Sequence, residues 1–212
     1  MNIIFEGISG SGKTTIIKQL LKELTSAKID VTFVPDLEYD TPLKGILLNL
    51  INNNLFMESE KNFRTSLFES LLLAANHHYT QEKLRQNNGI TIYDRDFISV
   101  LSMQKEIIKK EYSNWEEFYV SFRNIMLFSL KKIDYIVFVE TAIDICKKRI
   151  IYRDAVNLSS DDLDLLTQIN SNMKLECEEL SKKYGFEIIY INGAESIEHN
   201  VRKIKEKVLV KR

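Results

Sequence analysis

The chain has 212 residues, of which 44% are hydrophobic, so it is long enough to bury a full core as one domain. Its 29 Lys and Arg residues nearly balance 30 Asp and Glu residues, which argues against nucleic acid or an anionic membrane as the main partner. No apolar run approaches the roughly 18 residues of a membrane span, and the chain start lacks the basic region of a signal peptide. We therefore expect a cytoplasmic protein.

Short apolar runs alternate with segments of helical periodicity along the chain, as in proteins built on a parallel sheet. The apolar runs predict strands near residues 2–5, 29–34, 90–93, 135–139 and 186–191. Helical spacing predicts helices near residues 15–24, 58–87, 97–110, 114–131, 145–152, 161–184 and 197–208. A further helix is expected to begin with Thr41 as its N-cap and Pro42 as its first residue. The sequence thus predicts a three-layer α/β fold, in which helices cover both faces of a five-stranded parallel sheet.

Some other features of the sequence are interpreted as parts of the folded core or its helices and not as catalytic or metal-binding residues. The segment 58–87 is either one helix or two helices broken near residues 76–78. Apolar residues recur at helical spacing from Trp115 to Leu130, which is typical of a core or a dimer surface. The cysteines Cys146 and Cys177 form no C-x-x-C pair and are interpreted as reduced side chains. His77 and His78 lack a third nearby ligand, so we do not expect a metal site there, although one of them could reach a bound base.

The first predicted strand leads into a glycine-rich turn with the pattern G-x-x-x-x-G-K-[ST], the phosphate-binding loop. Its glycines allow consecutive backbone N–H groups to point at phosphate oxygens, Lys13 adds a positive charge, and the Thr14 hydroxyl can bind Mg²⁺. The residues assigned to this cradle are Gly7, Ser9, Gly10, Ser11, Gly12, Lys13, Thr14 and Thr15. A turn without a ligand is the plainer alternative, and the strand before the motif and the helix after it argue against that alternative. The sequence therefore predicts ATP with Mg²⁺ as the ligand.

Charged residues also follow two other predicted strands, where ligands of an open parallel sheet collect. Asp36 and Glu38 follow the second strand, and Asp94 and Arg95 follow the third. An aspartate at this point can hold Mg²⁺ or its water, and an arginine can grip a phosphate. A surface ion pair or a helix cap is the alternative interpretation of Asp94 and Arg95.

A basic run, residues 147–153, closes one predicted helix. Arg149 and Arg153 lie on one helical face, and a mobile cationic segment there could supply charge during phosphoryl transfer. Complementing the negative end of the helix dipole is the alternative, and we prefer it for Lys147 and Lys148.

Taken together, these residues resemble thymidylate kinase. The matching stretches are Phe5-Glu6-Gly7, Gly12-Lys13-Thr14-Thr15, Thr41-Pro42-Leu43, residues 71–76, Asp94-Arg95, Ser99 and Gln104. The resemblance implies a single P-loop nucleoside monophosphate kinase domain over residues 1–212, γ-phosphoryl transfer from ATP, a homodimer, and a lid around residues 149–160. It implies catalytic roles for Lys13, Arg95, Arg149 and Arg153, metal binding by Thr14 and Asp94, and acceptor contacts from Asp36, Glu38, Leu73, His77, Arg95, Ser99 and Gln104.

The chain departs from the family pattern where that family contacts the sugar, the acceptor phosphate and thymine. Ser9 stands in place of an acidic loop residue, residues 35–38 replace Arg-Glu-Pro, and residues 73–77 read Leu-Ala-Ala-Asn-His instead of Phe-Ala-Ala-Asp-Arg. Asp36 or Glu38 would repel a monophosphate but could take a proton from a neutral hydroxyl. A kinase acting on a nucleoside or another small hydroxyl compound therefore remains an alternative, as do an NTP-binding switch or ATPase and a family member that binds nucleotide without catalysis.

Overall fold

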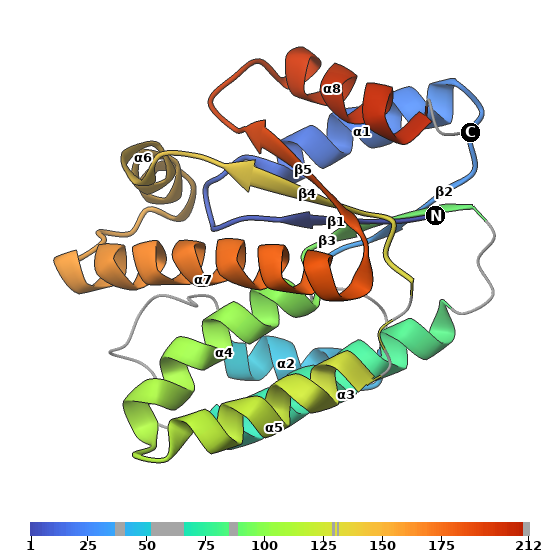
Figure 1. Cartoon of the computed structure of the whole chain (residues 1–212). Helices are drawn as coiled ribbons and strands as arrows, with labels where there is room; N and C mark the ends of the chain where they lie inside the picture. The colour runs from blue at the N-terminus through green and yellow to red at the C-terminus, as the bar shows by residue number, and fades with distance from the viewer. Residues whose placement is uncertain (37–40, 52–65, 85–88, 129, 131, 210–212) are drawn as a thin grey trace.

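The computed structural model describes residues 1–36, 41–51, 66–84, 89–128, 130 and 132–209 (Figure 1). Glu38, one of the predicted acceptor contacts, lies outside these residues. Within them one parallel sheet is formed by β1 (Asn2–Glu6), β2 (Val31–Val34), β3 (Ile90–Asp94), β4 (Tyr135–Glu140) and β5 (Glu187–Asn192). The strand order is β2-β3-β1-β4-β5, so β1 lies in the middle, with Ile4 paired to Tyr93 on one side and to Ile136 on the other.

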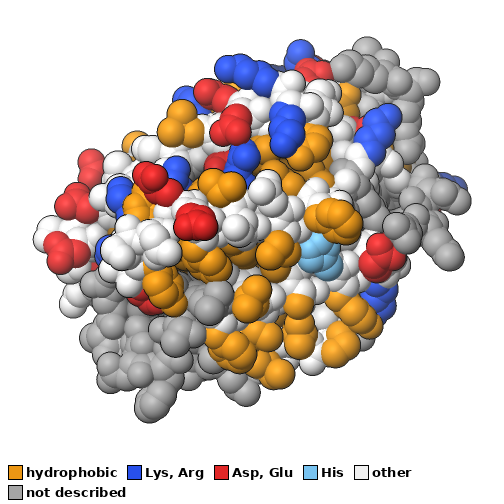
Figure 2. All heavy atoms as spheres, turned by 60° about the horizontal axis from the view of Figure 1, so that its bottom comes forward, with side chains coloured by type: hydrophobic (Ala, Val, Ile, Leu, Met, Phe, Trp, Pro, Cys, Tyr) orange, Lys and Arg blue, Asp and Glu red, His pale blue; other side chains and the backbone are white. Residues whose placement is uncertain are grey.

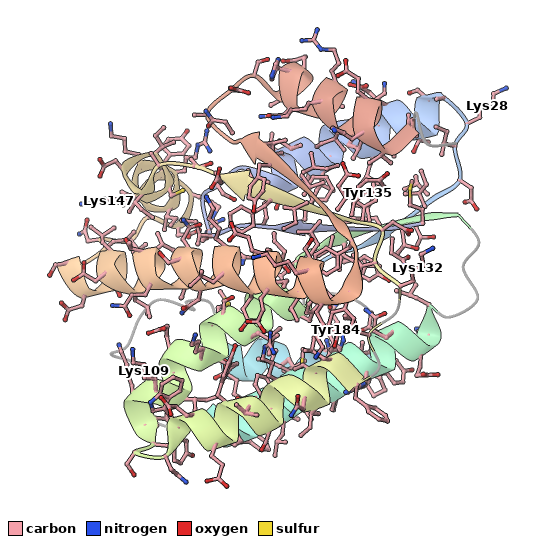
Figure 3. The ribbon with its side chains drawn as sticks, in the orientation of Figure 1. Lys28, Lys109, Lys132, Tyr135, Lys147 and Tyr184 are labelled. Atoms are coloured by element: carbon pink, nitrogen blue, oxygen red, sulfur yellow. The ribbon has the colours of Figure 1, made fainter. Side chains whose placement is uncertain are left out.

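Apolar side chains on both faces of the central strands explain why helices cover the sheet twice. The helices are α1 (Lys13–Ser26), α2 (Lys44–Ile51), α3 (Ser66–Lys83), α4 (Phe97–Glu111), α5 (Trp115–Phe128), α6 (Ile143–Asp154), α7 (Ser160–Tyr184) and α8 (Ile197–Leu209). Helices α1 and α8 pack on one face, where Ile17 and Ile204 meet Phe5 and Val137 (Figure 1). Tyr135 points to this side, and its hydroxyl donates to the Lys207 carbonyl at 3.3 Å (Figure 3).

The opposite face carries the larger group of helices. Helices α4 and α7 lie directly beneath the sheet, and α3 and α5 pack outside α4 (Figure 1). The core of this side includes Phe97, Phe122, Met126 and Met173, all at most 1% exposed. The predicted apolar stripe of α5 is therefore core, and both cysteines are buried free thiols, as expected.

These observations confirm the predicted α/β fold. Of the two alternatives for the segment 58–87, the described part, α3, runs unbroken through residues 76–78. One local prediction is wrong. The helix expected to begin at Thr41 and Pro42 begins at Lys44 instead. In the structure the Thr41 hydroxyl donates to Asn76 Oδ1 at 2.5 Å, and the Thr41 carbonyl accepts from Lys44 N in a turn that precedes the helix.

Because all the strands are parallel, their carboxyl ends meet at one edge of the sheet. The loops after β1, β2 and β3 carry the phosphate-binding motif, Asp36 and Arg95 respectively. Helix α6 lies at the same edge (Figure 1). The fold thus gathers the residues that the sequence singles out.

Candidate active site

The loop between β1 and α1 needs glycine for steric as well as conformational reasons. Gly7 and Gly10 have φ values of +144° and +75°, which favour residues without a Cβ. A Cβ would lie 2.7 Å from the Val139 carbonyl oxygen at Gly7 and 2.6 Å from the Cys146 carbonyl oxygen at Gly10. The loop is therefore fitted closely against the end of β4 and against α6.

The residues that close the loop join it to the end of β3. Lys13 is 5% exposed and donates through Nζ to the Ile8 carbonyl at 3.1 Å, across the loop. Burial, with the charge of Arg95 as a smaller contribution, lowers the pKa of Lys13 to about 7. The Thr14 hydroxyl donates to Asp94 Oδ2 at 2.7 Å, so the two predicted metal ligands do lie together.

A cleft of about 940 Å³ opens over the loop, which is within the size range of small-molecule sites. Predicted site residues that line it are Ser9, Gly10, Gly12, Lys13, Thr14, Thr15, Asp36, Asp94, Arg95, Arg149 and Arg153. Gly7 and Ser11 are buried beneath the cleft instead, and Ser11 Oγ has no hydrogen-bond partner among the described residues. The cleft therefore unites most of the predicted triphosphate site.

Both predicted lid arginines reach the loop from α6. Arg149 donates through Nη1 to the carbonyls of Gly10 at 3.1 Å and Ser11 at 3.2 Å. Arg153 donates through Nη2 to Ser9 Oγ at 3.1 Å and pairs with Asp154, whose Oδ1 lies 2.6 Å from its Nε. Lys147 and Lys148 are not among the cleft residues, in keeping with the plainer interpretation of their charges.

Arg95 is fixed at the meeting point of β3 and α4. Its φ of +69° is unusual for a residue with a side chain, and its backbone N–H donates to the Phe5 carbonyl at 2.9 Å. The guanidinium Nε lies 3.2 Å from Asp36 Oδ2, and Nη1 donates to Ser99 Oγ at 3.1 Å. The acid that follows β2 and the arginine that follows β3 therefore form an ion pair at the cleft.

A buried carboxylate, Glu6, lies behind this arginine and holds the start of α4. Glu6 accepts the N–H groups of Asp96 at 3.1 Å and Ser99 at 3.3 Å, together with the Ser99 hydroxyl. Burial raises the pKa of Glu6 to about 8, although the Ser99 hydrogen bond and the charge of Arg95 act in the opposite direction. A chain of contacts thus runs from Glu6 through Ser99 to Arg95.

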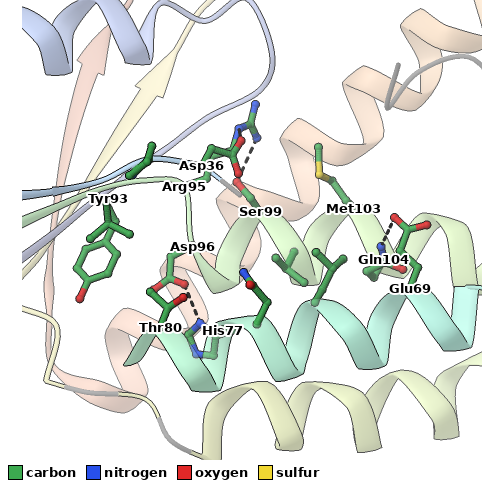
Figure 4. A pocket seen from close by; sticks show the side chains of 15 residues that line it. Asp36, Glu69, His77, Thr80, Tyr93, Arg95, Asp96, Ser99, Met103 and Gln104 are labelled. Atoms are coloured by element: carbon green, nitrogen blue, oxygen red, sulfur yellow. Dashed lines mark hydrogen bonds and ion pairs between the residues drawn. The ribbon is translucent and has the colours of Figure 1, made fainter. Parts of the chain in front are cut away.

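A second, narrower pocket lies between α3 and α4 and meets the cleft (Figure 4). Its lining residues are Val34, Pro35, Asp36, Glu69, Leu73, Asn76, His77, Thr80, Tyr93, Arg95, Asp96, Ser99, Val100, Met103 and Gln104. Pro35, Asp36, Arg95 and Met103 line the cleft as well, so they mark the junction. The predicted acceptor contacts Leu73, His77, Ser99 and Gln104 are all found in this pocket.

Polar groups bridge α3 and α4 at both ends of the pocket (Figure 4). At one end Gln104 donates through Nε2 to Glu69 Oε1 at 3.1 Å, and Gln104 Oε1 accepts from the Ser70 hydroxyl at 2.9 Å. At the other end His77 Nδ1 lies 2.7 Å from Asp96 Oδ1. Leu73 and Val100 lie between these ends in sequence, so the middle of the pocket is apolar.

Sequence reasoning missed Glu6, Glu69 and Asp96 as site residues. Glu6 carried a signal, because an acid directly after an apolar strand is placed at the ligand edge of the sheet. Asp96 stands two residues after Asp94, and only the fold reveals that it turns away to His77. Among the described residues no group of three or more His, Cys, Asp and Glu side chains forms a ready metal site.

Comparisons with known proteins agree with this geometry. A family model described as Thymidylate kinase matches residues 5–204. The thymidylate kinase of Campylobacter jejuni (strain RM1221) is 26% identical over 214 residues, which cover 97% of this chain and 98% of that protein. A probable thymidylate kinase of Methanobrevibacter smithii is 32% identical over 105 residues, which cover 50% of this chain and 52% of that protein.

The fold has a close counterpart among solved structures. The structure of deoxyadenosine kinase from M. mycoides with bound dATP matches with a TM-score of 0.69 and 15% identity, over 99% of this chain and 100% of that chain. At this identity the likeness concerns the fold alone. Because the family model spans residues 5–204, nearly the whole chain, the chain belongs to the thymidylate kinase family.

Proposed function

We propose that this protein transfers the γ-phosphoryl group of ATP to a deoxynucleoside monophosphate, as an ATP-dependent nucleotide kinase of the thymidylate kinase family. The observation that carries this proposal is the junction of two pockets at Asp36 and Arg95. A kinase needs a phosphate cleft and an acceptor pocket that meet at the transferring group, whereas a switch or an ATPase needs only the cleft. The family membership supports the same reaction.

The phosphate-binding loop and the end of β3 supply the donor half of the site. The loop N–H groups and Lys13 would bind the β and γ phosphates, which would restore the charge of Lys13 against the effect of its burial. Thr14 and Asp94 present two oxygen ligands of the kind that Mg²⁺ prefers, and they would hold a Mg²⁺ ion that neutralises phosphate charge when bound.

Arginines supply the charge that transfer requires. The acceptor oxygen attacks the γ phosphorus while the bond to the β–γ bridging oxygen breaks, and ADP leaves. Arg95, at the junction, would bind the acceptor phosphate or the transferring group. Arg153 would release Ser9 Oγ and bind phosphate oxygens instead. Arg149, on the same face of α6, would likewise release the loop carbonyls and bind phosphate oxygens. We propose that residues 149–160 act as the lid that brings this charge and keeps water out.

A second candidate, a nucleoside kinase, is favoured by one specific observation. Asp36 Oδ2 lies 3.2 Å from Arg95 Nε, so the guanidinium that an acceptor phosphate would bind is already paired with a carboxylate. A neutral hydroxyl would meet no such competition, and Asp36 could accept its proton as a general base.

We also propose that two copies of the chain associate through the outer faces of α3 and α5. Large apolar side chains there are exposed, namely Phe68, Leu71, Tyr79, Val120, Ile125 and Phe128, and Phe128 is 90% exposed. Figure 2, which brings this side of the molecule forward, shows hydrophobic side chains gathered on it. A face of this kind on a folded chain marks a protein interface. Within the described residues no helix has the length and apolar character needed to cross a bilayer, and we propose a cytoplasmic location.

A panel of acceptors tests the proposal. The protein is incubated with Mg²⁺, ATP and each deoxynucleoside or its monophosphate, and both ADP and the phosphorylated product are measured. We expect transfer to at least one monophosphate, at a rate well above ATP hydrolysis without an acceptor. Faster transfer to an uncharged acceptor than to every monophosphate would move the assignment to the nucleoside kinase. Hydrolysis without transfer would favour the switch or ATPase, and ATP binding without turnover would indicate a family member that has lost catalysis.

A further inference from the structure

Arg95 is held in an unusual backbone conformation at the point where the two pockets meet. Its φ of +69° lies in the left-handed region, which a residue with a side chain keeps only when its surroundings impose it. Its N–H donates to the carbonyl of Phe5, the residue before Glu6 on β1, at 2.9 Å. The segment that carries Arg95 is therefore tied to the end of β1.

Glu6 supplies the cap that the first turn of α4 lacks. Asp96, the N-cap residue, makes no side-chain cap hydrogen bond, and its carboxylate contacts His77 at 2.7 Å and Gln81 at 3.1 Å instead. Glu6 Oε1 accepts the N–H of Asp96 at 3.1 Å and that of Ser99, the third residue of the helix, at 3.3 Å. These are the two N–H groups that a capping box satisfies, so an acid on β1 performs this task for α4.

The second oxygen of Glu6 leads to the guanidinium of Arg95. Glu6 Oε2 shares a hydrogen bond with the Ser99 hydroxyl, and Ser99 Oγ accepts from Arg95 Nη1 at 3.1 Å. On its other side Arg95 Nε lies 3.2 Å from Asp36 Oδ2 (Figure 4). An acceptor phosphate at Arg95 would displace Asp36, and the contact with Ser99 would then keep the guanidinium in place.

Glu6 itself is placed to act only through its neighbours. Its side chain is 0% exposed and lines neither the cleft nor the acceptor pocket. Burying a carboxyl group costs free energy that an apolar side chain would avoid, and its hydrogen bonds offset that cost. The side-chain hydrogen bonds of Glu6 described above all go to Asp96 and Ser99, the residues that follow Arg95.

We propose that Glu6 is a positioning residue, which acts through Ser99 and the start of α4 to hold the Arg95 guanidinium where the acceptor phosphate binds. This inference rests on the proposed function in taking Arg95 to bind that phosphate. Glu6 therefore contributes to affinity for the phosphate group of the acceptor and not to affinity for its nucleoside part.

The phosphate contribution can be measured as a ratio of two dissociation constants. Calorimetry at pH 7 without ATP gives Kd for each of the four common deoxynucleosides and for its monophosphate. For the pair that binds most tightly, we expect the wild type to bind the monophosphate at least about fivefold more tightly than the nucleoside. A smaller ratio, or no measurable binding of any monophosphate, would overturn the inference.

Variants at two positions assign the ratio to the contacts described above. Ser99→Ala removes the link to Arg95, and Glu6→Met keeps the length of the side chain but removes both oxygens; each should lower the ratio about threefold or more. Burial raises the pKa of Glu6 to about 8, so at pH 7 the acid mostly carries its proton. Glu6→Gln then reproduces it, with an oxygen for the N–H groups and a donor for Ser99 Oγ, and should stay within about twofold of the wild type.

Glu106→Met is the matched control. Glu106 is a buried acid on the same helix, accepts from Asn172 Nδ2 on α7 at 2.6 Å, and lines neither pocket. The control should leave the ratio unchanged even where it lowers the urea midpoint.

Three results with the variants would overturn the inference. The first is an unchanged ratio in Ser99→Ala, or in Glu6→Met shown to be folded by circular dichroism. The second is equal weakening of nucleoside and monophosphate, which would leave Glu6 a purely structural role. The third is a loss in Glu6→Gln as large as in Glu6→Met, which would implicate the charge of the acid and not its hydrogen bonds.

The binding assay separates this inference from the proposed function. The expected ratios without ATP-dependent transfer to any acceptor would remove the function and leave the positioning role. Transfer to a monophosphate whose ratio is the same in the wild type and all the variants would leave the function and remove the positioning role.

Discussion

The ion pair between Asp36 and Arg95 should restrict the use of acceptors that already carry a phosphate. Arg95 Nε lies 3.2 Å from Asp36 Oδ2, and a monophosphate must displace this carboxylate or share the guanidinium with it. Asp36→Asn removes the negative charge while keeping the shape of the side chain. We expect the variant to bind monophosphates more tightly than the wild type does.

The size of the effect follows from the exposure of the two partners. A hydrogen bond to a charged group contributes roughly 1.5–3 kcal/mol when it is shielded from water. Here the arginine side chain is 11% exposed, but the aspartate side chain is 39% exposed, so the lower end of that range applies. A difference of about 1.4 kcal/mol corresponds to a factor of ten in affinity.

Steady-state kinetics with a coupled ADP assay measure this effect. For the monophosphate that the wild type uses best, KM should fall about tenfold in Asp36→Asn with little change in kcat, the pattern of a change that affects ground-state and transition-state binding equally. Glu23→Gln is the matched control, because it breaks an ion pair with Lys205 on the surface of α1. An unchanged or higher KM would refute the reasoning. A loss of about 100-fold or more in kcat on a nucleoside acceptor would instead identify Asp36 as a general base.

Four further outcomes are expected. Because burial holds the pKa of Glu6 at about 8 in the folded chain, above its ordinary 4.5, wild-type stability should fall as pH rises between these values. Urea titrations at pH 5 and pH 8 should show that fall and a smaller one in Glu6→Gln; equal falls would contradict the burial argument. Lys13→Met should lower kcat by at least about 100-fold without lowering the urea midpoint at pH 8, since it removes the charge that would bind phosphate but also a buried amine whose charged form is disfavoured by burial. Arg153→Ala should lower kcat more than Lys148→Ala does, because Arg153 donates to Ser9 of the loop and lines the cleft, whereas Lys148 does not line it; equal effects would count against the lid. Phe128→Asp should shift the mass measured by light scattering from dimer to monomer, whereas Leu175→Asp, an exposed apolar position on α7, should not.

The residues that the sequence assigns to phosphate binding lie together in the structure because they are local in the chain. The glycines, Lys13 and Thr14 are contiguous, and the strand and helix around them can be recognised from periodicity alone. Asp94 could be added because a short parallel strand delivers its next residue to the same edge of the sheet.

The proposed acceptor pocket was less accessible to sequence reasoning because it depends on contacts between distant elements. Neither the pairing of Asp36 with Arg95 nor that of His77 with Asp96 leaves a trace in spacing, since the partners come from different elements of the fold. Thr41 illustrates the same limit. Its type and its place before Pro42 favour an N-cap, but α2 begins at Lys44, and the Thr41 hydroxyl donates to Asn76 on α3.

The central claim is that ATP and an acceptor meet where the two pockets join. It is tested most directly by following the γ phosphate of labelled ATP across the panel of deoxynucleosides and their monophosphates, with wild-type protein and with Asp94→Asn as the inactive control. The account predicts label on at least one monophosphate with the wild type, at least about 100-fold faster than with the variant. Label released only as inorganic phosphate, with none on any acceptor, would contradict it.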